Sequence, residues 1–567
     1  MSSVSSSTTL SSILDDSGQF PIYTHLKEIY PPSEIEHKYM PLYEDLRSKY
    51  LSLFSNQDPA LIISIPYTIT LFGDCISKLF PDRIVSNTSN DMILLINHNT
   101  SSTITIRFFD HILEVTEPIT QPPSESAFTA ASQSKPELKD FLVYGYNSGV
   151  LHSKTTTAPI GANILINLNT PTTSNNVDLY INAFMAAFIA ALCVNNAFPK
   201  TKNALYDMAS LALANIMKYK DEWCYYSSDL YFKVFLKKNS IGCFVNNATT
   251  VYDVNAVCDC GKYKSFIFDT FSPQPIGYYS SKLYWNKRRV DCRLAMALVL
   301  KLSNTDSTFE EVKQCCSSFI TFMAMYDNDI DKVVDNVNKC LKDTPYTRYE
   351  IKETIGLSYD ILDLLKGIDT PEGALLAKEY ELKKRLMYVI NEYKHVMTMN
   401  DMLSSNTNNS VNTSSSDSSK FITLLTKSAD NLRDNCECYS DEMKRAMKAV
   451  CSSNKYTNTS FKLISEGWCG NMLALGVNSE IDDIEKELTA YYEKYNETHG
   501  SGDLVSMWIS DDISRYCYVS SFNGGLSFLN PKYEDFMLEY VKLKNTKMQE
   551  VLTTANTATT AGNTSSK

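Results

Sequence analysis

The chain has 567 residues, of which 44% are hydrophobic, and a formal net charge of −12 at pH 7. This length and apolar content predict two or more domains, or one large two-lobed body, with a sizeable core. The acidic balance and the lack of a basic stripe argue against a nucleic-acid partner. The longest apolar run, Leu179 to Val194, is interrupted by Asn182 and is short for a membrane span.

Three polar segments lie outside the expected core. Residues 1–19 are rich in Ser and Thr and are expected to be disordered, as is an insertion at residues 403–420. Residues 541–567 read as a polar tail. The N-terminal segment has neither the basic start nor the apolar run of a secretion signal, so we expect a cytoplasmic protein.

Apolar periodicity predicts mixed helices and strands, then mostly helices, then strands again. Helices are predicted at 38–56, 137–153, 178–196, 204–219, much of 287–400 and 480–500, and strands at 61–73, 92–98, 102–110, 162–169, 243–254, 265–271 and 461–477. In the helix that begins near Asp178, we expect Phe184, Phe188 and Leu192 to be buried on one face. This order favours a two-lobed α+β protein.

The cysteines and histidines do not form a metal-binding pattern. The sequence has 15 cysteines but no C-x-x-C pair, and its seven histidines are scattered. We therefore expect buried free thiols and no metal site built from these residues.

Five separated stretches contain the polar residues and glycines expected around a small-molecule site: SIPYTITLFGDCISK (64–78), NTPTTSNNVDLYINAF (169–184), CYYSSDLYF (224–232), YWNKRRVDCRLAMAL (284–298) and ISEGWCGN (464–471). In order and spacing they resemble the galactokinases, a family of GHMP small-molecule kinases that includes fungal galactose sensors. The resemblance covers roughly residues 20–520. It implies a ribosomal protein S5 domain 2-like N-terminal lobe at 20–250 and an α+β C-terminal lobe at 251–540.

The first stretch corresponds to the family's sugar-holding segment, which reads roughly SPGRVNLIGEHTDY. Pro66, Leu71 and Gly73 match it, whereas Thr68 replaces the Arg and Cys75 replaces the His. A hexose needs several fixed donors and acceptors, because each unpaired buried polar group costs about 1–3 kcal/mol. The resemblance makes Asp74 and Ser77, together with the aromatic Trp285 of the fourth stretch, candidate sugar-binding residues.

The second and fifth stretches correspond to phosphate loops, read in the family as DVPTGSGLSSSAA and TGAGWGGC. Glycines let backbone N–H groups surround a phosphate at a helix N-terminus. The candidate nucleotide-binding residues here are Thr172, Ser174, Asn175, Asn176, Asp178, Gly467 and Gly470. Asn175, Asn176 and Asp178 replace the glycine–serine core, and Glu466 replaces a small residue. At about 4 Å, two unit charges repel by about 4 kcal/mol at an effective dielectric near 20, so Asp178 disfavours a polyphosphate.

The third stretch corresponds to the family's GGMDQ, and Asp229 aligns with its catalytic Asp. A carboxylate can orient a hydroxyl nucleophile or accept its proton. In the fourth stretch Asn286, Arg288, Val290 and Cys292 match the family's YNxRxxEC, with Asp291 for the Glu. We expect Arg288 and Asp291 to be structural and to pair at a helix start.

The resemblance implies transfer of the ATP γ-phosphate to galactose with Mg²⁺, but the replaced residues predict weak or absent activity. The leading interpretation is a pseudokinase that acts as a ligand-responsive or scaffold protein, with galactose or a related sugar, weakly held ATP or a protein as partner. The alternatives are an active galactokinase-type enzyme with an atypical phosphate loop, and an unrelated α+β interaction protein.

Overall fold

The structure is a computed structural model. It describes residues 20, 22–31, 34–55, 57–73, 79–99, 101–109, 114–119, 138–153, 160–168, 177–218, 227–246, 248–270, 278–356, 361–365, 377–408, 415–451, 455–464, 471–499, 517–520, 522–523 and 526–529.

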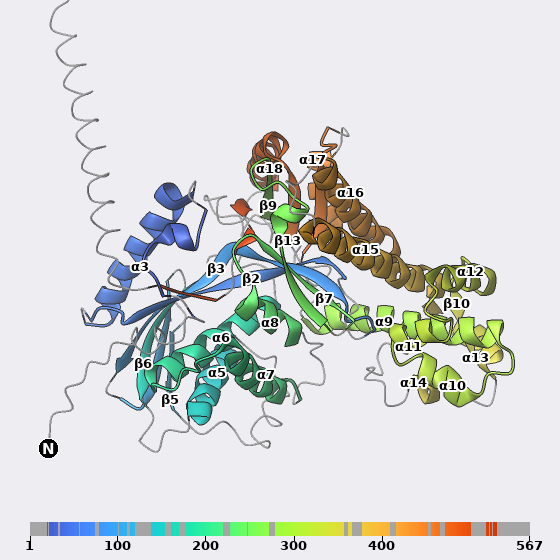
Figure 1. The fold of residues 1–567 in the computed structure, drawn as a ribbon, viewed down its shortest axis with the longest axis horizontal. Helices are drawn as coiled ribbons and strands as arrows, with labels where there is room; N and C mark the ends of the chain where they lie inside the picture. Colours follow the sequence, from blue (N-terminus) through green and yellow to red (C-terminus); the bar gives the residue numbers. More distant parts are fainter. Residues whose placement is uncertain are drawn as a thin grey trace, which may run out of the picture.

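The N-terminal lobe is built on a mixed sheet with a long antiparallel hairpin at its centre (Figure 1). The hairpin consists of β2 (Leu61–Phe72) and β3 (Arg83–Asn99). The sheet order is β1 (Ile22–Tyr23), β16 (Ser527–Leu529), β2, β3, β6 (Gly161–Leu168), β4 (Thr103–Phe108) and β5 (Glu114–Pro118). β7 (Ser240–Val245) and β15 (Phe522–Asn523) also pair with β3, and β8 (Ala248–Asp253) pairs with β7.

Alternation along β2 explains how helices cover both faces of this sheet. Leu61, Ile63 and Ile65 belong to the core that includes α5 (Leu138–Ser153), α6 (Val177–Val194) and α7 (Lys202–Lys218). Ile62 faces the other way, into the core made with α3 (Met40–Leu53).

Helix α6 confirms the prediction for the apolar run. It follows β6 in the chain, and Phe184, Phe188 and Leu192 are each 0% exposed. Among the described helices, none combines the length and the apolarity needed to cross a bilayer. The apolar character of α6 is therefore accounted for by burial between the sheet and its neighbouring helices.

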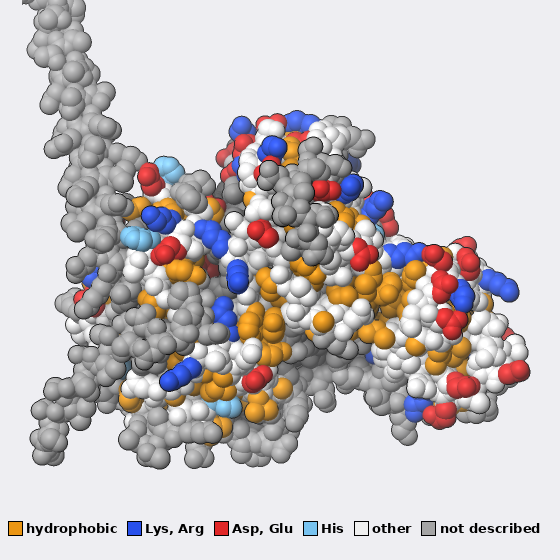
Figure 2. All heavy atoms as spheres, viewed as in Figure 1, with side chains coloured by type: hydrophobic (Ala, Val, Ile, Leu, Met, Phe, Trp, Pro, Cys, Tyr) orange, Lys and Arg blue, Asp and Glu red, His pale blue; other side chains and the backbone are white. Residues whose placement is uncertain are grey.

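The C-terminal lobe has a second sheet, in the order β12 (Thr459–Leu463), β13 (Asn471–Val477), β9 (Tyr263–Asp269) and β14 (Cys517–Ser520). Its helices are α9 (Tyr278–Ser303), α10 (Phe309–Cys315), α11 (Phe319–Ala324), α12 (Ile330–Cys340), α13 (Arg348–Ile355), α14 (Ile361–Leu365), α15 (Leu382–Asn408), α16 (Ser415–Asn431), α17 (Asp441–Cys451) and α18 (Asn478–His499). β10 (Tyr346–Thr347) and β11 (Glu379–Tyr380) form a two-stranded antiparallel sheet, with α13 and α14 between them in the chain. Helices α10–α14 form an end of the molecule, where Figure 2 shows acidic and basic side chains interspersed on the visible face.

The strand β2 belongs to both lobes. Its first half is in the N-terminal core, whereas Ile69, Leu71 and Phe72 belong to the core of the C-terminal lobe. Helices α15 and α16 of the C-terminal lobe both contact β2. The two lobes are therefore joined by a shared strand as well as by the surfaces that they bury.

The expected disordered insertion at 403–420 needs correction for its described residues. α15 continues to Asn408 and α16 begins at Ser415. Leu403 is 0% exposed in the C-terminal core, and the Ser418 hydroxyl accepts a hydrogen bond from the Asp259 N–H at 3.2 Å. A few buried contacts are enough to anchor a helix end that is otherwise polar. The Ser- and Asn-rich composition of this segment therefore gave no sign of the two helix ends. Residues 409–414 lie outside the described residues.

The close packing of α5 on α6 depends on two glycines one helical turn apart. A Cβ on Gly145 would lie 2.4 Å from the Phe184 carbonyl oxygen, and one on Gly149 would lie 2.6 Å from the Phe188 carbonyl oxygen. Any side chain there would push against the backbone of α6.

We predict that Gly145→Ala lowers the free energy of unfolding by about 1–3 kcal/mol, because the added methyl group overpacks the interface. Urea unfolding measures this change. Leu151→Ala on the same helix is the control, since Leu151 is 58% exposed and its truncation should cost about 0.5 kcal/mol or less. A Gly145→Ala protein as stable as the wild type would contradict the close packing.

Candidate functional site

Most of the predicted site residues lie outside the described residues. These are Asp74, Ser77, Thr172, Ser174, Asn175, Asn176, Gly467 and Gly470. The backbones of Asp178, Asp229 and Trp285 are described and lie in α6, α8 (Ser227–Phe235) and α9, but their side chains are not. Their roles stay predictions. The surroundings can be built from the described residues next to them in the chain.

Strand β2, which contains the matched Pro66, Leu71 and Gly73 region, is irregular at two points. Its register with β3 shifts between Pro66 and Thr68, and again between Thr70 and Phe72. Such bulges bend a strand and take backbone groups out of the ladder. A buried carbonyl that leaves the ladder needs another donor.

At the first irregularity, side chains from two helices bind the same carbonyl. The Pro66 carbonyl oxygen accepts hydrogen bonds from Asn182 Nδ2 of α6 at 3.2 Å and from Lys233 Nζ of α8 at 3.0 Å. Asn182 and Lys233 are 0% and 1% exposed. Asn182 follows Asp178 by one helical turn, and Lys233 follows Asp229 by one turn, so both helices approach β2 close to a predicted site residue.

Thr68, which stands where the family has Arg, is engaged locally. Its hydroxyl donates a 2.9 Å hydrogen bond to Asn87 Oδ1 on the paired strand β3. A threonine at this position cannot reach a ligand as an arginine could. Lys233 Nζ, which binds the Pro66 carbonyl, also lies 6.0 Å from the ring centre of Tyr67, the residue before Thr68.

At the second irregularity, the C-terminal lobe provides both partners. Lys462 Nζ of β12 donates to the Leu71 carbonyl oxygen at 2.6 Å, and the Gly73 N–H donates to Glu392 Oε2 of α15 at 3.1 Å. Gly73 has φ +85°, and a Cβ there would lie 2.4 Å from the Asp82 carbonyl oxygen. Only glycine fits this position, which matches the glycine of the family's segment.

Lys462 and Glu392 are both 0% exposed and belong to one network. Lys462 Nζ donates to the Ser428 hydroxyl at 2.6 Å, and this hydroxyl donates to Glu392 Oε2 at 3.0 Å. Asn431 Nδ2 and His395 Nδ1 each lie 3.1 Å from Glu392 Oε1. We call Glu392, Ser428 and Lys462 the β2 clamp.

The network keeps Glu392 ionised despite its burial. Burial raises the pKa of Glu392, but the hydrogen bond from His395, the charge of Lys462 and the Asn431 amide together lower the pKa to about 2. The clamp therefore holds a carboxylate and an ammonium side by side in the interior, each bound to the backbone of β2.

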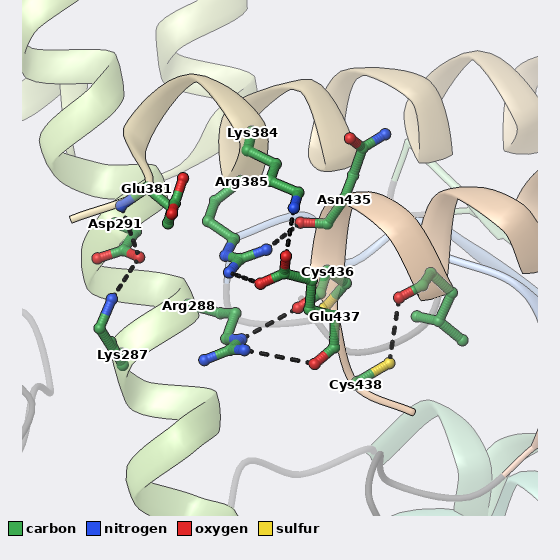
Figure 3. A network of polar contacts seen from close by, with 11 residues as sticks. Lys287, Arg288, Asp291, Glu381, Lys384, Arg385, Asn435, Cys436, Glu437 and Cys438 are labelled. Carbon is green, nitrogen blue, oxygen red and sulfur yellow. Dashed lines mark hydrogen bonds and ion pairs between the residues drawn. The ribbon is translucent and has the colours of Figure 1, made fainter. Parts of the chain in front are cut away.

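The matched segment of α9 holds the fold together (Figure 3). Arg288 Nε donates to the Cys436 carbonyl oxygen at 3.0 Å, and Arg385 of α15 pairs with the Glu437 carboxylate at 2.5 Å. Asp291 pairs with Lys287 at 2.9 Å, and burial raises its pKa. Arg288 and Asp291 do have structural contacts, as predicted, but the predicted pairing at a helix start is wrong: α9 begins at Tyr278, so both residues lie inside the helix, and the ion pair of Asp291 is with Lys287.

Sequence reasoning missed Asn182, Lys233, Glu392, Ser428 and Lys462. The last three are polar residues in helices and strands with no motif around them. Two signals were available in retrospect: Asn182 interrupts an otherwise apolar helix, and Lys233 lies four residues after a predicted catalytic aspartate. Their partners, however, are more than a hundred residues away along the chain.

We predict that Glu392→Gln flattens the acid dependence of stability. The pKa of Glu392 is lowered by folding, so its stabilisation is complete above the unfolded pKa near 4.3 and is lost as the pH falls towards 2. The lost contribution is on the order of 3 kcal/mol. Urea unfolding at several pH values between 7 and 2.5 measures it.

Glu437→Gln is the matched control for this experiment. The pKa of Glu437 is also lowered to about 2, by Lys384 and Arg385 against a cost of burial, but its side chain is 43% exposed. Solvent screens such a pair, so the slope should change less. Equal slopes for wild type and Glu392→Gln would show that Glu392 is not held ionised.

Similarity to known proteins is found in solved structures. No family model matches the sequence, and no curated protein does either. The structure is similar to Lactococcus lactis galactokinase complexed with galactose, with TM-score 0.52 and 13% identity over 86% of this chain and 99% of that chain. Methanococcus jannaschii mevalonate kinase has TM-score 0.41 and 12% identity over 76% of this chain and 94% of its own. The galactokinase likeness, at this identity, shows that the chain has the two-lobed α+β fold of the GHMP kinases.

Proposed function

We propose that this protein is a galactokinase-like binding protein that holds a sugar, and a nucleotide weakly, with little or no phosphoryl transfer. Support comes from the fold likeness to galactokinase together with the order of the five matched stretches. The alternative of an unrelated α+β protein loses its basis, because the fold is that of the GHMP kinases.

The observation that carries the proposal is the meeting of three matched elements on β2. Asn182 of α6 and Lys233 of α8 both bind the Pro66 carbonyl, and Lys462 of β12 binds the Leu71 carbonyl. The chain places a predicted phosphate stretch before α6, a predicted catalytic aspartate one turn before Lys233, and the late glycine stretch directly after β12. These stretches therefore start or end around the strand that leads to Asp74.

Weak phosphoryl transfer is proposed because of what the start of α6 offers a phosphate. The helix begins at Val177, so Asp178 lies in its first turn. A first-turn aspartate is favourable for the helix itself, but it adds negative charge where unsatisfied N–H groups would otherwise attract an anion. With Asn175 and Asn176 in place of flexible glycines, and Glu466 in the late stretch, these residues fit Mg²⁺-bound ATP poorly.

An active kinase is the second candidate, and Lys233 is the observation in its favour. Phosphoryl transfer needs positive charge close to the transferring group, and Thr68 provides none. Lys233 places a buried ammonium beside β2, one helical turn from Asp229. If Asp229 orients the sugar hydroxyl, Lys233, one helical turn further along α8, would be a candidate source of positive charge for the transfer.

We predict that isothermal titration calorimetry detects galactose or a related hexose, detects Mg·ATP weakly, and that a coupled assay finds little or no sugar phosphorylation. Tight Mg·ATP binding with turnover would replace the pseudokinase proposal by the active kinase. If no sugar or nucleotide that is tested binds, both the ligand-binding pseudokinase and the active kinase are contradicted. The remaining interpretation would be a scaffold that binds a protein partner.

We predict that Asp178→Ser combined with Glu466→Ala raises Mg·ATP affinity by about tenfold for each 1.4 kcal/mol of repulsion removed, without restoring transfer. The missing glycine–serine backbone would still limit the preorganised electrostatics that transfer requires. Asp335→Ser with Glu353→Ala is the charge-matched control, since both residues are exposed on α12 and α13. Equal gains in both double variants would point to net charge alone, against a local phosphate site.

A further inference from the structure

The β2 clamp joins the two lobes through charged groups rather than through packing alone. Glu392, Ser428 and Lys462 come from α15, α16 and β12 of the C-terminal lobe. Their partners are the Leu71 carbonyl of β2 and the N–H of Gly73, the residue directly after β2. One lobe thus supplies an anion for a backbone donor and a cation for a backbone acceptor, two residues apart in the chain.

This arrangement is more directional than the apolar contacts around it. Phe72 already packs near Phe421 of α16, with ring centres 6.3 Å apart, and Leu71 is 0% exposed. Apolar contacts tolerate small sliding, whereas hydrogen bonds to ionised groups weaken steeply when the angle or distance changes. Buried ion pairs contribute little net stability compared with apolar packing, and fixing one geometry is a better-attested use of them.

The clamp acts where β2 leaves its regular ladder. The register with β3 shifts between Thr70 and Phe72, Phe72 still pairs with Ile84, and Gly73 then turns at φ +85°. In this stretch the partner strand no longer dictates the backbone position in full. The C-terminal lobe does so instead, through Lys462 on one side and Glu392 on the other.

We propose that Glu392 and Lys462 are positioning residues that make the end of β2 follow the C-terminal lobe. The predicted sugar-side residue Asp74 comes directly after Gly73 in the chain, so we infer that the C-terminal lobe influences its placement. One consequence for ligand binding follows: a change in the C-terminal lobe should alter sugar affinity through the clamp. This consequence rests on the proposed function, whereas the positioning role of the clamp does not.

Hydrogen–deuterium exchange of the full chain tests the clamp without any ligand. In Glu392→Gln and in Lys462→Met, amide exchange in the segment that ends at Gly73 should rise by about tenfold or more, because local opening no longer breaks a charged contact. Exchange of α18, which packs on β13, β9 and α17, should change by less than about twofold. A uniform rise over the whole C-terminal lobe, or no rise, would overturn the proposal.

Lys233→Met is the matched control. It too removes a buried lysine from a β2 carbonyl, but it acts on Pro66 and from the N-terminal lobe. Exchange near Pro66 should rise and exchange at Gly73 should stay within about twofold of the wild type. If Lys233→Met loosens Gly73 as much as Lys462→Met does, β2 responds to any lost charge and the clamp has no special role.

Ser428→Ala keeps the experiment decisive if a charge variant fails to fold. It removes only the hydroxyl that joins Lys462 to Glu392, and a rise in exchange at Gly73 of about threefold is expected. An unchanged Gly73 amide in a folded Ser428→Ala protein would contradict the bridged network.

Calorimetry with galactose then tests the consequence. In Lys462→Met, galactose affinity should fall by about fivefold or more, whereas Lys332→Met, which breaks an exposed ion pair with Asp327 in the same lobe, should leave it unchanged. Equal affinities in wild type and Lys462→Met would overturn the ligand-dependent part. If the wild type binds no galactose, the proposed function fails. The exchange results still test whether Glu392 and Lys462 position the end of β2.

Discussion

The strand β2 is the constraint on which the rest of the structure depends. It contributes Leu61, Ile63 and Ile65 to one core and Ile69, Leu71 and Phe72 to the other, so it has to be long, apolar and buried. It is also irregular at two places, and a buried carbonyl without a donor costs about 1–3 kcal/mol. Two buried lysines, from α8 and β12, supply the donors at Pro66 and Leu71. Their long unbranched side chains can reach a strand from neighbouring elements while their stems pack in the core.

The buried lysine of the C-terminal lobe is balanced by a nearby carboxylate. The positive charge of Lys462 faces Glu392 through the Ser428 hydroxyl, so the C-terminal lobe holds a nearly neutral unit. The N-terminal lobe has its own buried carboxylate, Asp91, which accepts a 2.5 Å hydrogen bond from Tyr30 and one from Ser64. Buried acidic and basic side chains in both lobes thus bind to backbone or hydroxyl partners that fix their positions, as burial requires.

Much of the fold was predictable because the spacing of apolar residues along the sequence indicates which side of a helix or strand is buried. The 16-residue apolar run became α6, and the alternation in 61–73 became β2, since each pattern states directly which face is covered. The prediction for 403–420 went wrong for the opposite reason: its polar residues hide the few contacts, at Leu403 and Ser418, that extend two helices. The clamp could not be predicted, because Glu392 and Lys462 look like surface residues until partners more than 300 residues away are known.

The residues that match the galactokinase pattern and that the structure describes share a property. Gly73 is required by its backbone geometry, Arg288 binds carbonyls, and Val290 and Cys292 are buried in the core. Each of these roles serves the fold. The family residues that this chain replaces, the Arg at Thr68 and the glycines at Asn175 and Asn176, are instead those whose side chain or flexibility would act on a ligand. Replacing them leaves the packing of β2 and α6 intact, because neither core needs an arginine at 68 or a phosphate at the start of α6. A fold of this kind can therefore keep its architecture while its ligand chemistry changes, provided that the carbonyls of β2 retain their donors.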